Sequence, residues 1–254
     1  MTSLIITLAL ILLYCNRSMV SWLVSIEGDY DIGALVLVRS IAEMNAFWKR
    51  LLARYNNYIA ERNLAIMTRV SYFSRAYLLG LSYNTYEAVS VSEPSKKEMD
   101  ERDECILGLL VNDARMPLSD IAHELWISTR IASGRIRELE RGSIITGYRT
   151  VFDIAKLGYQ HFKVMFRMRN ASAEKEKRFT GYMKQDPNII FNDEVLSGDD
   201  FEIELQVRDL DDLRRVLDDI DSKFSDMIRE HRIMRYYEEH KYLISNLYAV
   251  ARIS

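Results

Sequence analysis

The sequence predicts an α+β protein in which a small helical module is flanked by two similar α/β units. Three observations support this fold class. Residues 117–153 have the apolar periodicity of two helices joined by a tight turn, residues 161–237 alternate between strand and helix patterns, and residues 28–66 repeat part of that alternation. The 254 residues are 48% hydrophobic, which suffices for packed cores in two or three small domains.

Residues 3–15 form an apolar run near the N-terminus. The run is short for a membrane span, and neither a basic region nor a small-residue cleavage site frames it. We expect a buried helix there, or a fragment of a domain that starts upstream of Met1, with a signal peptide or membrane anchor as the alternative. Cys15 and Cys105 lie in no CxxC or CxH motif, which favours buried thiols in a reducing compartment.

The first patterned block predicts two strands, a helix and a third strand, at residues 20–25, 34–38, 41–58 and 64–72. A Gly-Asp turn at 28–31 joins the first two strands. The polar, proline-containing stretch that follows, 83–97, is expected to be a linker.

The central module reads as a winged helix-turn-helix. Pro117 sets the first turn of a short helix, and Ser128 is a good N-cap for the longer helix that follows the turn. That longer helix has an apolar stripe of Ala132, Ile136 and Leu139 and an opposite, cationic stripe of Arg130, Ser133, Arg137 and Arg141. A two-stranded wing is expected after it, up to residue 153.

Charge is unevenly distributed within this module. Residues 98–124 carry eight acidic side chains against two basic ones, whereas residues 128–149 carry five arginines against two glutamates. The charged face of a lone helix is usually only solvated, but this separation favours one helix that binds a polyanion while the rest is kept away from it. Because the net charge of the chain is −3, such binding has to come from a local patch.

The C-terminal block predicts a strand, a helix, two strands joined by a turn, a helix and a last strand, at residues 161–169, 173–185, 189–196, 201–208, 210–224 and 228–237. This is the β-α-β-β-α-β order of ferredoxin-like units. The N-terminal block matches part of it, because GDYDIGALVLVRSIAEM (28–44) aligns with GDDFEIELQVRDLDDL (198–213) and IAERNLAI (59–66) with IREHRIMR (228–235). The first unit is therefore expected to be an incomplete copy that lacks its first strand, with 3–15 as its first helix.

These segments resemble the Lrp/AsnC (feast/famine) family of transcription regulators. MDERDECILGLLVNDAR (99–115) and ISTRIASGRIRELERGSIITGY (127–148) resemble the family's winged helix, and residues 161–240 resemble its effector-binding dimerisation domain with a Gly-Asp turn. The whole chain resembles an archaeal-type tandem regulator whose N-terminal half is truncated. The expected domains are a truncated α/β domain (1–82), the linker (83–97), the winged helix-turn-helix (98–153) and the ligand-binding domain (154–254).

The resemblance implies a cytoplasmic, sequence-specific DNA-binding regulator that forms a homodimer or a larger oligomer and needs no cofactor. The residues expected to contact double-stranded DNA are Ser128, Thr129, Arg130, Ser133, Arg135, Arg137, Arg141 and Arg149. It also implies a small effector, such as an amino acid, with candidate contacts at Ser197, Gly198, Asp199 and Asp200 and at Gly28, Asp29 and Tyr30. The alternative for these seven residues is that they form plain tight turns.

The module departs from the family pattern at two glycine positions. Gly134 stands inside the longer helix, where an interior glycine costs about 1 kcal/mol relative to alanine. Ser143 takes the place of the usual glycine after the helix, and we expect Gly142 to terminate the helix instead.

An enzyme is the alternative from another functional class, since sirohaem decarboxylases are built from the same domains. Such a site needs clustered histidine and arginine, and His231 with Arg229 and Arg232 on the last strand is the nearest arrangement in this sequence. Strand alternation, however, predicts that His231 and Arg232 lie on opposite faces. Neither a Ser/His/Asp set, a phosphate-binding loop nor a metal-ligand spacing of the histidines is found, so the sequence favours the regulator.

Overall fold

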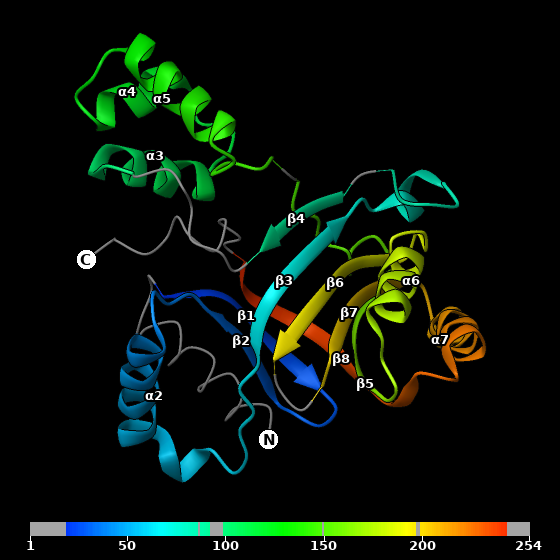
Figure 1. Ribbon diagram of the computed structural model, residues 1–254. Coiled ribbons are helices and arrows are strands. Elements are labelled where there is room, and N and C mark those ends of the chain that lie inside the picture. Colours follow the sequence, from blue (N-terminus) through cyan, green and yellow to red (C-terminus); the bar gives the residue numbers. More distant parts are fainter. Residues whose placement is uncertain (1–18, 86, 92–98, 149, 197–198, 243–254) are drawn as a thin grey trace.

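The computed structural model describes residues 19–85, 87–91, 99–148, 150–196 and 199–242. Figure 1 shows a curled antiparallel sheet with helices outside it, and a separate group of three helices. The strand order of the sheet is β2-β1-β8-β5-β7-β6-β3-β4. The expectation of a helix at 3–15 lies outside the described residues.

The C-terminal part has the predicted ferredoxin-like order. Its elements are β5 (Gln160–Met168), α6 (Ala173–Met183), β6 (Ile189–Leu196), β7 (Phe201–Val207), α7 (Leu210–Phe224) and β8 (Ile228–Tyr242). The neighbours run β8-β5-β7-β6, and all pairs are antiparallel. Alternate strand residues face α6 and α7, so that Phe166, Ile203 and Leu205 are buried with Phe179 and Ile220 of the helices. The predicted elements are confirmed here, and β8 continues beyond its predicted end at 237.

The N-terminal part does not form a sheet of its own. Its elements are β1 (Val20–Glu27), β2 (Ile32–Val36), α2 (Ile41–Tyr55), the 3₁₀ helix η1 (Asn56–Tyr58), β3 (Ile66–Phe73) and a second 3₁₀ helix η2 (Ala76–Leu79). The β1–β2 hairpin pairs with β8 at one edge of the four C-terminal strands, and β3 pairs with β6 at the opposite edge. Strands from both predicted α/β domains, 1–82 and 154–254, therefore share one sheet.

Part of the predicted linker is a strand. β4 (Glu87–Val91) pairs antiparallel with β3, within the stretch 83–97 that composition marks as a linker. The physical reason is that β3 has a partner on one side only, at β6, and its other edge presents unpaired backbone groups that β4 satisfies.

The face of the sheet that turns away from α6 and α7 is mixed in character. Val24 and Ile26 of β1 pack there against Met165, Met234 and Tyr236. A layer of buried charged side chains from β5, β6 and β7 continues the same face, and includes Lys163, Asp193, Glu202 and Glu204.

The helical module consists of α3 (Glu101–Asn112), α4 (Leu118–Glu124) and α5 (Thr129–Arg141). Its small core includes Ile106, Ile121, Ala132 and Leu139. The two-stranded wing predicted after α5 is absent from the residues that the structure describes between 143 and 153. Instead of extending, the chain folds back onto the end of α5, because the backbone amide of Ile144 donates to the Leu139 carbonyl at 2.9 Å and the Ile144 side chain is buried.

Over the described residues, no helix combines the length and apolar character that a membrane crossing requires.

Candidate functional site

The helix α5 is set at the surface of the module by its caps and its apolar stripe. The Ser128 hydroxyl accepts a hydrogen bond from the Ile131 amide at 3.3 Å, as an N-cap does. Ala132 and Leu139 are fully buried against α3 and α4, which turns the opposite side of α5 outward. The predicted apolar and cationic stripes of this helix are thus found as expected.

The outward side of α5 holds most of the residues predicted to contact DNA. Ser128, Thr129, Arg130, Arg137 and Arg141 are exposed, and Ser133 is partly buried. The guanidinium groups of Arg130 and Arg137 have no hydrogen-bond or ion-pair partner within the described part of the chain, whereas Arg141 Nε donates to the Arg137 carbonyl at 3.4 Å. Arg149 lies outside the described residues.

Arg135 has a different environment from the other arginines of α5. Its guanidinium Nη1 lies 2.8 Å from carboxylate oxygens of both Asp100 and Asp103 on α3. Asp103 is buried, and Asp100 caps the N-terminus of α3 by accepting the Asp103 amide at 2.9 Å. That backbone hydrogen bond, together with Arg135, lowers the pKa of Asp100. Arg135, which the sequence places near DNA, therefore links α5 to α3 through these two ion pairs.

The C-terminus of α5 is capped by Gly142, as expected, and its backbone amide donates to the Glu138 carbonyl at 2.9 Å. The left-handed conformation that often follows a helix is adopted by Ser143, with φ 55°, while Gly142 has φ −78°. A Cβ at Gly134 would meet nothing within 4 Å, which leaves an open site on α5. Trp126, in the turn between α4 and α5, has φ 53° and is 90% exposed.

The first Gly-Asp turn lies directly on β8. The Ile26 amide donates to the Asp31 carbonyl at 2.9 Å and closes the turn. Gly28 has φ 142°, and a Cβ on it would lie 3.2 Å from the Ile233 carbonyl oxygen, so only glycine allows this approach of the two backbones.

The second Gly-Asp turn is described from Asp199 onward, and Ser197 and Gly198 lie outside the described residues. Asp199 and Asp200 are bound within the protein: the Asp199 carboxylate pairs with Arg232, and Asp200 Oδ2 accepts the Met168 amide at 2.7 Å. The Asp200 amide in turn donates to the Phe166 carbonyl at 2.9 Å. The described part of this turn is therefore fixed to β5.

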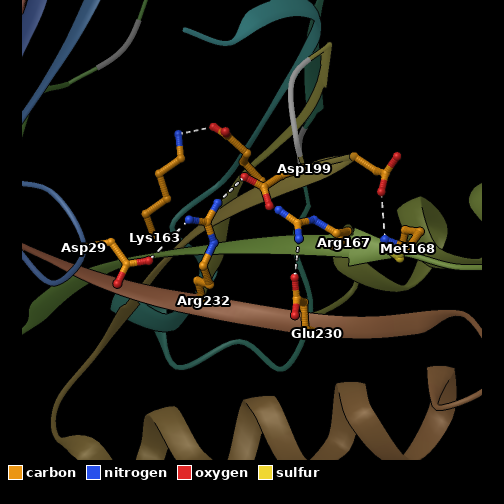
Figure 2. A network of polar contacts seen from close by, with 9 residues as sticks. Asp29, Lys163, Arg167, Met168, Asp199, Glu230 and Arg232 are labelled. Atoms are coloured by element: carbon orange, nitrogen blue, oxygen red, sulfur yellow. Dashed lines mark hydrogen bonds and ion pairs between the residues drawn. The ribbon is translucent and has the colours of Figure 1, made fainter. Parts of the chain in front are cut away.

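Arg232 brings the two turns together, which the sequence did not indicate. Figure 2 shows its guanidinium between Asp29 of the first turn and Asp199 of the second. Burial works against its charge, but hydrogen bonds to Tyr30 and Asp199 raise the pKa of Arg232, so the side chain stays charged. The pairing of Arg232 with both turns depends on the register of β1 and β5 against β8, which only the folded chain defines.

Buried charged groups beside this network form two further pairs among the described residues. Lys163 forms an ion pair with Glu202, and His161 Nε2 lies 3.0 Å from Glu204 Oε2. Desolvation in the interior raises the pKa of Asp193 well above its ordinary value, because the attraction of Lys163 does not outweigh burial and the nearby Glu204 and Glu202.

Two residues of the enzymatic alternative, His231 and Arg232, lie on opposite faces of the sheet. His231 lies on the helix side of the sheet, with Nδ1 3.5 Å from Asp221 of α7, while Arg232 faces the two turns on the other side. The predicted separation of these two side chains is confirmed.

No family model matches the chain. The HTH-type transcriptional regulator AldR of Mycolicibacterium smegmatis is 28% identical over 120 residues, which cover 47% of this chain and 70% of that protein. The HTH-type transcriptional regulator LrpA of Pyrococcus horikoshii is 44% identical over 61 residues, 24% of this chain and 43% of that protein.

Two solved structures share the fold. An AsnC family transcriptional regulator from Agrobacterium tumefaciens superimposes with a TM-score of 0.52 at 23% identity, over 57% of this chain and 94% of that one. The transcriptional regulator NMB0573 from Neisseria meningitidis, solved as a complex with L-Met, gives 0.52 at 15% identity, over 58% and 96% of the two chains.

Proposed function

We propose, since this chain belongs to the Lrp/AsnC family of transcription regulators, that it recognises operator DNA through the outward side of α5. The observation that carries this proposal is the difference between the arginines of one helix. Arg130 and Arg137 are exposed, and their guanidinium groups have no partner among the residues that the structure describes, whereas Arg135 forms ion pairs within the module. Planar guanidinium groups that project from a helix bind phosphates and guanine edges. Arg130 and Arg137, with Ser128, Thr129, Ser133 and Arg141, form the DNA surface in this proposal.

The functional unit in this proposal is a homodimer or a larger oligomer in the cytoplasm. Each chain carries one helix-turn-helix in its described part, and two-fold operators place half-sites about one helical turn apart. Two chains are then needed to occupy both half-sites.

The N-terminal strands are, in this proposal, a second copy of the C-terminal unit, and the described residues hold no strand in the position of its first one. In a ferredoxin-like order the first strand lies between the third and the fourth, so without a strand there β2 and β3 are not neighbours and each has an open edge. The pairing of β1 with β8 and of β3 with β6 fits this origin, and β4 lies beside β3 in the place of a first strand. The chain thus pairs two units internally.

The effector in this proposal is a small molecule such as an amino acid, bound at the Gly-Asp turns. The complex of NMB0573 with L-Met supports this class of ligand.

Segment 150–159 connects the DNA-binding module to the sheet in this proposal and would transmit the effect of the ligand. Tyr159 contacts the Tyr77 ring with centroids 4.6 Å apart, and Arg75 lies over the Phe152 ring. Relatives named as regulators, and the separation of His231 from Arg232, disfavour the decarboxylase alternative.

Selection of bound fragments from genomic DNA by the purified protein, with and without amino acids, tests the function and yields an operator. The double variant Arg130→Ala/Arg137→Ala should then lose binding to that operator in a gel shift. The control Arg214→Ala/Arg215→Ala removes the same charge from exposed positions of α7 and should bind as the wild type does. Equal binding by both double variants would exclude the α5 surface.

A further inference from the structure

Arg232 of β8 is the one side chain in Figure 2 that contacts residues of both Gly-Asp turns. Its Nη1 lies 3.3 Å from Asp29 Oδ2, and its Nη2 lies 2.5 Å from Asp199 Oδ2. Asp29 belongs to the hairpin between β1 and β2, and Asp199 precedes β7. Two turns that are far apart in the sequence therefore share one guanidinium.

The two ion pairs of Arg232 differ in burial. The Asp199 side chain is 2% exposed, whereas the Asp29 side chain is 50% exposed and the Arg232 side chain 31%. Loss of a partner from a buried pair leaves an uncompensated charge in the interior, but exposed pairs contribute little to stability. Asp29 is therefore the partner that can be displaced, and Asp199 is the one that holds Arg232 in place.

The backbone of the first turn is held independently of Asp29. Gly28 approaches the β8 backbone at Ile233, the amide of Ile26 closes the turn, and Glu27 pairs with Arg235 at 3.2 Å. Release of the Asp29 carboxylate from Arg232 thus leaves the hairpin attached to β8. The guanidinium that it frees faces solvent on one side and Tyr30 on the other.

We propose that Arg232 binds the carboxylate of the effector, and that Asp29 is an internal stand-in which this carboxylate displaces. A guanidinium presents several N–H donors in a fixed fork, which can bind both oxygens of a carboxylate. Asp29 makes a single contact with Arg232, at 3.3 Å, and so does not use this bidentate geometry. The proposal rests on the proposed function, since it concerns the effector of the regulator. It gives the chain one carboxylate site at which residues of both turns meet.

Removal of the competing carboxylate is the sharpest test. Each of the twenty standard amino acids, and acetate, is titrated into the full-length wild type and into Asp29→Asn by calorimetry. The variant should bind the responding amino acid about two- to fivefold more tightly, as expected for loss of an exposed competing pair. The control Glu27→Gln removes a carboxylate from the same hairpin, where it pairs with Arg235, and should leave the affinity unchanged.

Removal of the arginine gives the opposite result. Arg232→Gln should lower the affinity at least tenfold, and the amine that corresponds to the responding amino acid without its carboxylate should not bind. Because Arg232→Gln removes the cation beside the buried Asp199 carboxylate, Asp199→Asn/Arg232→Gln is measured beside it. Arg167→Gln, which breaks a neighbouring pair with Glu230, is the control for general attraction of anions and should bind as the wild type does.

Three outcomes would overturn the assignment of Arg232. These are undiminished binding by both Arg232 variants, no gain in affinity for Asp29→Asn, or no binding of any of these probes to either the wild type or Asp29→Asn. None of them concerns operator binding by α5, which the gel shift measures without any amino acid. A failure of this inference is therefore distinguishable from a failure of the proposed DNA-binding function.

Discussion

Arg135→Ala is predicted to destabilise the helical module without removing a contact to DNA. The arginine lies in the middle of α5, and sequence pattern alone groups it with the DNA-binding residues. In the structure its guanidinium is 2.8 Å from both Asp100 and Asp103, and the Asp103 side chain is only 9% exposed. Truncation therefore leaves two neighbouring carboxylates without their cation, one of them in the interior.

The size of the effect follows from the exposure of the three groups. Loss of one partner from a fully buried pair costs about 3–5 kcal/mol, whereas exposed pairs contribute about 0–1 kcal/mol. Because Arg135 is 23% exposed and Asp100 54% exposed, an intermediate loss of about 2–3 kcal/mol is expected. For a module of this size, that corresponds to a fall of about 10 °C or more in its melting temperature.

Hydrogen exchange of the α3 and α5 amides, beside thermal unfolding followed by circular dichroism, measures this effect where it arises. The control is Arg137→Ala, which lies two residues further along α5 and has an exposed side chain. It should leave exchange in α3 unchanged. Two results together would refute the reasoning. The α3 amides of Arg135→Ala would be as protected from hydrogen exchange as those of the wild type, and the variant would weaken operator binding as much as Arg137→Ala does.

Arg137→Ala should weaken operator binding by about 1–3 kcal/mol if the guanidinium contacts a base. If it contacts a phosphate instead, the slope of log K against log salt concentration should become shallower by about one. Gel shifts at several salt concentrations distinguish these two results. Trp126→Gly should raise the stability of the module by about 1 kcal/mol, because glycine adopts the left-handed conformation at this position without the clash of a Cβ. The side chain that is lost is 90% exposed, and its ring lies 6.2 Å from that of His123. An unfolding midpoint that falls would contradict this. The raised pKa of Asp193 implies stability that is fully present below about pH 4 and lost as pH rises through the native-state pKa. Asp193→Asn should abolish that loss, seen as a smaller decline between acid and neutral pH in urea unfolding; an unchanged decline would exclude Asp193 as its cause.

The sequence by itself determined the elements that depend on local signals. Ser128 and the apolar stripe of Ala132 and Leu139 are enough to define α5, since a cap and a 3.6-residue period are both short-range properties. The same holds for β6 and α7, whose observed bounds coincide with the predicted ones. The outward side of α5 followed directly, because the side chains opposite a buried stripe have to face solvent.

Only the tertiary structure decided which distant groups become partners. A strand pattern does not state which edge the strand will join, so the single shared sheet and the pairing of β4 within a polar stretch were set by open edges elsewhere in the fold. Arg135 and Arg232 look like other arginines in the sequence, and their roles come from carboxylates 32 to 203 residues away. Charge interactions depend on distance and burial in space, neither of which the order of residues specifies.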